Sequence, residues 1–155
     1  MRFFIDADAC PVKDEVYRVA ERFGALVEVV SGQPLRAPQS SMIRLTIVGD
    51  AFDAADDWIA ERAGPGDIVI TADIPLADRV LKAGAAAIDP RGRPFTADSI
   101  GVAMAQRALM EDLRAMGTVS GGPPPFSKRD RSNFLQALDK AAHAARRSPG
   151  GPATP

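Results

Sequence analysis

Residues 3–8 read Phe3-Phe4-Ile5-Asp6-Ala7-Asp8, a run of large apolar side chains that ends in two carboxylates. Three consecutive apolar residues favour a short strand covered on both faces, as strands of a parallel sheet are. In an open parallel sheet, ligands bind outside the carboxyl ends of the strands. We therefore expect Asp6 and Asp8 to lie at the edge of the sheet where a site can form.

Two later stretches repeat this arrangement. Ile68-Val69-Ile70 is followed by Thr71 and Asp73, and Thr46-Ile47-Val48 is followed by Gly49-Asp50. The carboxyl ends of parallel strands meet at one edge of a sheet, so these acidic residues should gather there. Thr71 is placed to donate a hydrogen bond to a carboxylate or to a phosphate.

A denser acidic cluster follows the third of these strands. Asp53 and Asp56 lie three residues apart and would share one face of a helix. The alternative is that Asp53 caps the helix and the remaining carboxylates favour its positive end. Carboxylates brought close together cannot all stay ionised without a positive partner, and Mg²⁺ and Mn²⁺ prefer oxygen ligands. The predicted metal site consists of Asp6, Asp8, Asp53, Asp56 and Asp73, of which Asp6, Asp8 and Asp73 are the catalytic candidates.

Short apolar runs alternate with helical patterns, which predicts a single α/β domain with a parallel sheet of about five strands wrapped by helices. The predicted strands are 2–6, 26–30, 45–48, 68–71 and 85–88. The predicted helices are 11–23, from about 53 to before 64, 75–83, 97–116 and 130–146. We expect the domain to span residues 1–147, and the Pro- and Gly-rich residues 148–155 to form a disordered tail.

Composition narrows the function classes. No apolar run approaches the roughly 20 residues of a membrane span, and a single cysteine suits a reducing compartment. We therefore expect a cytoplasmic protein without a membrane partner. Residues 1–90 carry 9 Lys/Arg and 15 Asp/Glu, whereas residues 91–155 carry 10 and 5. An acidic body beside a basic C-terminal part fits a metal site flanked by a phosphate-binding surface.

The basic residues supply candidates for phosphate binding. A helix that starts near Ser127 with several arginines offers backbone N–H groups and guanidinium groups to an anion. The alternative is an ordinary capped surface helix with solvated charges. The predicted substrate-binding residues are Lys13, Arg36, Thr71, Arg91, Arg129 and Arg131.

The sequence gives little support to nucleotide-binding motifs or to cysteine-based catalysis. The chain has neither a dinucleotide-binding Gly-x-Gly-x-x-Gly nor a P-loop motif. Cys10 follows the acidic motif, but the single histidine is His143, near the other end of the chain, so no Cys–His pair is expected. We interpret Cys10 as a buried structural residue.

Three motifs carry a family resemblance: Asp6-Ala7-Asp8-Ala9-Cys10-Pro11, Thr71-Ala72-Asp73-Ile74-Pro75-Leu76-Ala77 and Arg129-Asp130-Arg131. Pro90-Arg91-Gly92 and Gly121-Gly122-Pro123 strengthen it. With these, the chain resembles the YaiI/YqxD family over about residues 2–146. That family is grouped with PIN-like domains, whose nucleases hold Mg²⁺ or Mn²⁺ with a few acidic residues and hydrolyse RNA.

The resemblance implies a metal-dependent PIN-like ribonuclease, and two other functions stay open. One is a non-catalytic module with the same fold that binds RNA or protein. The other is a phosphatase of the haloacid dehalogenase type, in which the first Asp of an Asp-x-Asp motif is the nucleophile. Lys82 is a poor positional match for the lysine that such a phosphatase needs, and 155 residues leave little room for its cap domain.

Overall fold

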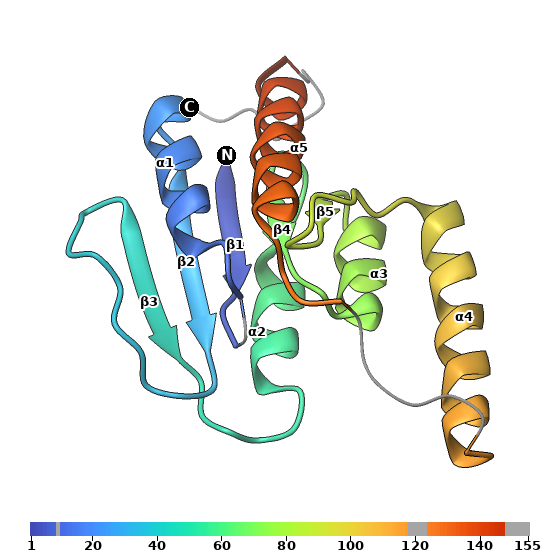
Figure 1. The fold of residues 1–155 in the computed structure, drawn as a ribbon. Coiled ribbons are helices and arrows are strands. Elements are labelled where there is room, and N and C mark those ends of the chain that lie inside the picture. The colour runs from blue at the N-terminus through green and yellow to red at the C-terminus, as the bar shows by residue number, and fades with distance from the viewer. Residues whose placement is uncertain (9, 118–123, 148–155) are drawn as a thin grey trace.

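Five parallel strands form one sheet in the computed structural model, which describes residues 1–8, 10–117 and 124–147 (Figure 1). The strands are β1 (Arg2–Asp6), β2 (Leu26–Ser31), β3 (Ile43–Ile47), β4 (Ile68–Ile70) and β5 (Ala86–Ile88). Their order across the sheet is β3-β2-β1-β4-β5, and every neighbouring pair is parallel. The predicted α/β fold with a parallel sheet of five strands is confirmed.

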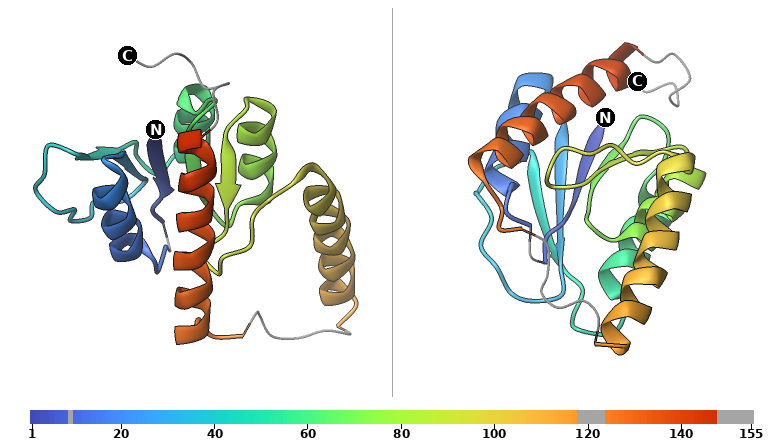
Figure 2. Two further views of the ribbon diagram at one scale, coloured as in Figure 1. Left: turned by 90° about the horizontal axis from the view of Figure 1, so that it is seen from above. Right: turned by 45° about the vertical axis from the view of Figure 1, so that its right-hand side comes forward.

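Helices cover both faces of this sheet. They are α1 (Lys13–Phe23), α2 (Ala54–Arg62), α3 (Ile74–Lys82), α4 (Ala97–Ala115) and α5 (Lys128–Arg147). Helices α1 and α5 lie on one face, and α2 and α3 lie on the other (Figures 1 and 2). Helix α4 stands apart from the sheet, beyond α3. None of the helices in the described part of the chain is long and apolar enough to cross a membrane.

The alternation of side chains along β1 divides the core into two layers. Phe3 and Ile5 point toward α1 and α5, where they pack with Phe134 and Leu138 of α5. Phe4 points to the opposite face and packs with residues of α2 and α3. Because both faces are covered, Phe3, Phe4 and Ile5 are fully buried, as the unbroken apolar run predicted.

The expectation of a strand covered on both faces is wrong for β3. This strand lies at the edge of the sheet, and its residues are only partly buried or exposed. The helix boundaries shift by one or two residues from those predicted; α1, for example, begins at Lys13 rather than Pro11. Gly24 ends α1 in the left-handed conformation, with φ of 64°, and the side chain of Thr96 caps α4. The predicted tail, residues 148–155, lies outside the described residues.

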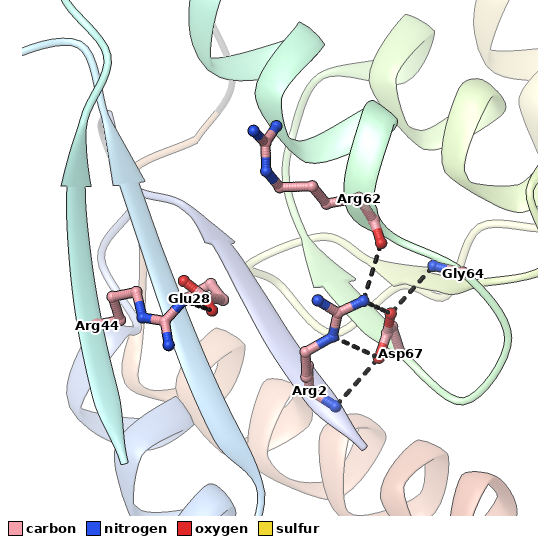
Figure 3. Close-up of polar contacts among 6 residues, drawn as sticks. All are labelled: Arg2, Glu28, Arg44, Arg62, Gly64 and Asp67. Atoms are coloured by element: carbon pink, nitrogen blue, oxygen red, sulfur yellow. Dashed lines mark hydrogen bonds and ion pairs between the residues drawn. The ribbon is translucent and has the colours of Figure 1, made fainter. Parts of the chain in front are cut away.

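Polar contacts fix the pairing of β1 with β4 at the end of the sheet away from the acidic residues (Figure 3). The carboxylate of Asp67, just before β4, accepts hydrogen bonds from the backbone N–H and the guanidinium of Arg2. It also accepts one from the backbone N–H of Gly64. Since strand pairing sets which residues meet at the far edge, these contacts align Asp6 with the end of β4.

Candidate functional site

The acidic residues gather where the strand order reverses. The chain runs outward from β1 through β2 to β3 and then returns to form β4 on the other side of β1. Asp6 is the last residue of β1, and Thr71 directly follows β4. The carboxyl ends of β1 and β4 therefore define the switch point at which α/β sheets bind ligands.

Thr71 links two of the predicted acidic residues. Its buried hydroxyl donates a 2.8 Å hydrogen bond to Oδ2 of Asp6 and accepts one of 2.9 Å from the backbone N–H of Asp73. Asp73 in turn caps α3, because its Oδ1 accepts a hydrogen bond from the backbone N–H of Leu76. One threonine thus orients the carboxylate at the end of β1 and the helix start that follows β4.

Asp8 is held from the neighbouring strand. Its two carboxylate oxygens accept hydrogen bonds from the hydroxyl of Ser31, at 2.9 Å, and from the backbone N–H of Gly32, at 3.0 Å. A Cβ atom on Gly32 would lie 2.8 Å from the backbone oxygen of Gly49. Glycine at position 32 therefore lets the loop after β3 come close to the connection after β2, whose backbone N–H at Gly32 holds Asp8.

The start of α2 supplies the remaining carboxylates. Asp53 occupies the N-cap position, but its side chain makes no capping hydrogen bond, so the alternative that Asp53 serves as a side-chain cap is not supported. Asp53 has φ of 61°, and it is the only non-glycine residue with positive φ in the described ranges. Such backbone strain in a non-glycine residue is concentrated at functional sites. Asp57 faces away and pairs with Arg79 at 2.8 Å.

All five predicted metal ligands line one open cavity of about 440 Å³. Asp50 lines it as well, together with residues of the two glycine-containing loops. The predicted site residues do not include Ser31, the last residue of β2, or Gly32, Gln33 and Gly49. The long polar connection between β2 and β3 is the sequence signal that could have found Gly32 and Gln33. The residues that line the cavity are Asp6, Asp8, Gly32, Gln33, Gly49, Asp50, Ala51, Asp53, Ala54, Ala55, Asp56 and Asp73.

The carboxylates influence one another's protonation. Burial raises the pKa of Asp56 to about 7, with further contributions from the charges of Asp73 and Asp6, a hydrogen bond with Asp73 and the charge of Asp53. Burial also raises the pKa of Asp6, against the hydrogen bond from Thr71, and the charges of Asp73 and Asp8 raise it further. The cavity therefore favours a positive charge, either a proton or a cation.

The donor chemistry fits Mg²⁺ or Mn²⁺, because every acidic side chain that faces the cavity offers carboxylate oxygens. In the described ranges, however, no group of three or more His, Cys, Asp or Glu side chains is already placed to hold a metal ion. Asp8 and Asp73 both use oxygens in hydrogen bonds to the protein. The residues thus fit a divalent cation in chemistry, and holding one requires some of these side chains to move closer together.

Two of the predicted substrate-binding arginines hold the fold together. Arg131 donates hydrogen bonds to the backbone oxygen of Pro11 and to Glu15, joining α5 to the start of α1. Arg91 donates to Asp130 at 2.9 Å and to the backbone oxygen of Pro124. These contacts occupy the guanidinium groups that we expected to be available for phosphate.

The other predicted substrate-binding residues also lie outside the acidic cavity. Lys13 donates to the backbone oxygen of Cys10, whereas Arg36 and Arg129 are exposed. Thr71 contacts the cavity through Asp6. Cys10 is buried, 7% exposed, as predicted, and burial raises the pKa of its thiol, which disfavours the reactive thiolate.

Comparison with known proteins assigns the chain to a sequence family. The family described as "Uncharacterized BCR, YaiI/YqxD family" matches residues 4–144. The chain is 60% identical over 148 residues to a UPF0178 protein of Nitrobacter winogradskyi, covering 96% of this chain and 94% of the relative. It is 64% identical over 138 residues to a UPF0178 protein of Sphingopyxis alaskensis, covering 88% and 90%. No solved structure matches the chain. The chain belongs to the YaiI/YqxD family.

Proposed function

We propose that this protein is a PIN-like, metal-dependent ribonuclease of the cytoplasm, and that it hydrolyses RNA phosphodiesters at the acidic cavity. The observation that carries this proposal is the meeting of Asp6, Asp56 and Asp73, from three separate elements, in surroundings that raise the pKa of Asp56 to about 7. Keeping several carboxylates together without a cation is unfavourable, and the arrangement is therefore best suited to binding one.

The proposed ligands are Asp6, Asp8, Asp73 and one of Asp53 or Asp56. When bound, Mg²⁺ or Mn²⁺ would activate a water molecule and neutralise charge on the phosphodiester. Thr71 would orient Asp6 through its hydroxyl, in the way that outer-shell groups orient metal ligands.

Asp8 has a comparable arrangement on the other side of the cavity. The hydroxyl of Ser31, which also lies 2.6 Å from the backbone oxygen of Gln33, and the backbone N–H of Gly32 both contact its carboxylate. Binding a cation would require Asp8 to share these oxygens or to turn. We expect the first outcome, because a carboxylate oxygen has lone pairs for more than one partner.

The test is cleavage of a labelled single-stranded RNA with Mn²⁺ by the wild type, Asp6→Asn, Asp73→Asn and Asp78→Asn. Asp78 is a matched control, since it lies outside the cavity and pairs with Lys82 on α3. We expect cleavage by the wild type and the control, and a loss of at least about 100-fold in the other two variants. Far-ultraviolet circular dichroism confirms that each variant is folded.

Each other result selects a different function. Binding of RNA without cleavage, unaffected by Mn²⁺, would replace the nuclease with the non-catalytic binding module. Cleavage that survives Asp6→Asn would show that the cavity is not the active site. Formation of an aspartyl-phosphate analogue on Asp6 would instead support the phosphatase.

A further inference from the structure

A second, larger cavity lies between α3, the loop after β5 and α4. Its volume is about 830 Å³, and its lining begins at Ala72. Ala72 immediately precedes Asp73, which lines the acidic cavity. Consecutive residues at the start of α3 thus line the two cavities. We call the larger cavity the α3–α4 groove.

Helix α4 leaves apolar side chains uncovered along this groove. Ile100 is the only residue of α4 that is buried. Val102 lines the groove and is 59% exposed, and Met110 lines it further along the helix. Ile74 of α3 and Phe95 of the preceding loop complete an apolar floor. A groove of this kind offers surface to the flat faces of bases.

Three arginines line the same groove, namely Arg93, Arg107 and Arg114. Among the described residues, Arg93 and Arg114 have no carboxylate within 4.0 Å of their guanidinium nitrogens, and Arg107 has only an exposed contact with Glu111 at 3.5 Å. Exposed ion pairs of this kind are weak, so Arg107 can exchange its partner.

Two carboxylates also line the groove, and one of them already accepts hydrogen bonds from the backbone. Asp89 accepts hydrogen bonds from the backbone N–H groups of Arg91 and Arg93, which reduces its influence on a ligand. Asp98 lies at the first turn of α4. The surplus of guanidinium groups, beside an apolar floor, is complementary to a polyanion that also has apolar faces.

We infer that single-stranded RNA binds in the α3–α4 groove, with phosphates on Arg93, Arg107 and Arg114 and bases against the apolar floor, and passes from there into the acidic cavity. This inference rests on the proposed function, because it supplies the RNA on which the acidic cavity would act. Duplex RNA hides the faces of its bases and should fit the groove less well. The sequence pointed to arginines at the start of the last helix for phosphate binding, whereas this inference assigns it to the arginines that line the groove.

The test measures binding of a fluorescein-labelled 12-nucleotide single-stranded RNA to the full chain by anisotropy. EDTA is present, so that metal-dependent cleavage does not interfere. The groove variant is Arg107→Ala/Arg114→Ala. The matched control, Arg18→Ala/Arg147→Ala, removes two exposed arginines from α1 and α5. Salt titrations from 50 to 300 mM KCl report how many phosphate contacts each variant has lost.

We expect the groove variant to bind at least about tenfold more weakly at 100 mM KCl, and its log–log salt dependence to become shallower by about 1.4 for two lost contacts. The control should remain within about twofold of the wild type, and the matching duplex should bind more weakly. Equal affinity of wild type and groove variant, or tighter binding of the duplex, would overturn the inference.

Two further outcomes separate this inference from the proposed function. Weaker binding by the groove variant, with no cleavage by the wild type in Mn²⁺, would retain the groove as an RNA site and refute the nuclease. Cleavage that depends on Asp6, with unchanged RNA binding by the groove variant, would retain the nuclease and refute the groove as the RNA site.

A stable dimer that buries α4, detected by sedimentation and by protection of α4 from hydrogen exchange, would show that a second copy occupies the groove and would overturn the inference.

Discussion

Replacing Asp56 with Asn should stabilise the metal-free protein. The pKa of Asp56 is raised from 3.8 to about 7 by burial and by the charges of Asp73 and Asp6. In a fully buried site, a difference of about three between the folded and unfolded pKa values would correspond to roughly 4 kcal/mol. Asp56 is only partly buried, so solvent screening reduces the expected gain to about 1–2 kcal/mol.

The gain should depend on pH in a defined direction. Between pH 4 and 7 the folded protein keeps a proton on Asp56 that the unfolded chain has released, so raising the pH through this range destabilises the wild type. Asn has no such proton. The advantage of Asp56→Asn should therefore be largest above pH 7 and fall toward zero as the pH approaches 4.

The assay is thermal unfolding in EDTA from pH 5 to 8, followed by the same measurement with Mn²⁺. At pH 8 the expected gain corresponds to a rise in Tm of roughly 2–8 °C. With Mn²⁺ at 100 times its Kd, the wild type should gain about 2.7 kcal/mol, and Asp56→Asn should gain less if Asp56 is a ligand.

Asp57→Asn is the matched control for this experiment. Asp57 is the next residue on α2, but it pairs with Arg79 and lies outside the cavity. Its replacement should leave stability unchanged or slightly reduced, and should leave the response to Mn²⁺ intact. The electrostatic reasoning would be refuted if Asp56→Asn were no more stable than the wild type at pH 8, or if its gain in stability were the same at every pH.

Three further substitutions test how the site is supported. Gly32→Ala should lower Mn²⁺ affinity in calorimetry, because the added Cβ would force the loop that orients Asp8 to shift; unchanged affinity would show that the loop adapts. Arg131→Ala should destabilise the protein by about 1–3 kcal/mol in urea unfolding, because it leaves the buried carboxylate of Glu15 without its partner; a loss of RNA binding without a loss of stability would restore Arg131 as a substrate residue. Glu28→Gln should be neutral or stabilising by about 1 kcal/mol in the same assay, because removing the charge of a carboxylate that is 5% exposed and lacks a partner on Oε2 offsets the loss of its 3.4 Å ion pair with the exposed Arg44; a marked loss of stability would show that the charge is needed.

The fold was predictable because its signals are local. The apolar run at Phe3-Phe4-Ile5 and the glycine at position 24 each determine a feature without help from distant residues. The edge strand β3 escaped this reasoning, since periodicity reports how apolar a strand is and says nothing about its place in the sheet. Strand order depends on which segments pack together, and that is a property of the whole chain.

The acidic residues were predictable for a related reason. Strand ends in a parallel sheet share an edge, so carboxylates after β1 and β4 had to be neighbours. The basic residues carried no comparable constraint. Arg131 and Arg91 sit in two separate motifs that suggest phosphate binding, yet their guanidinium groups bind Glu15 and Asp130 across 116 and 39 residues of sequence. Pairing over such distances cannot be read from local spacing.

The distribution of charge gives a physical reason for two separate cavities instead of one. A cavity that holds a divalent cation needs carboxylates, and these repel the phosphates of RNA until the cation is bound. Arginines placed within the acidic cavity would neutralise its carboxylates and weaken the metal site. Placing Arg107 and Arg114 on α4, outside the acidic cavity, avoids this conflict. This arrangement also predicts how RNA binding depends on metal. RNA should bind the groove without metal, and Mn²⁺ should tighten RNA binding only when Asp6 and Asp73 are intact.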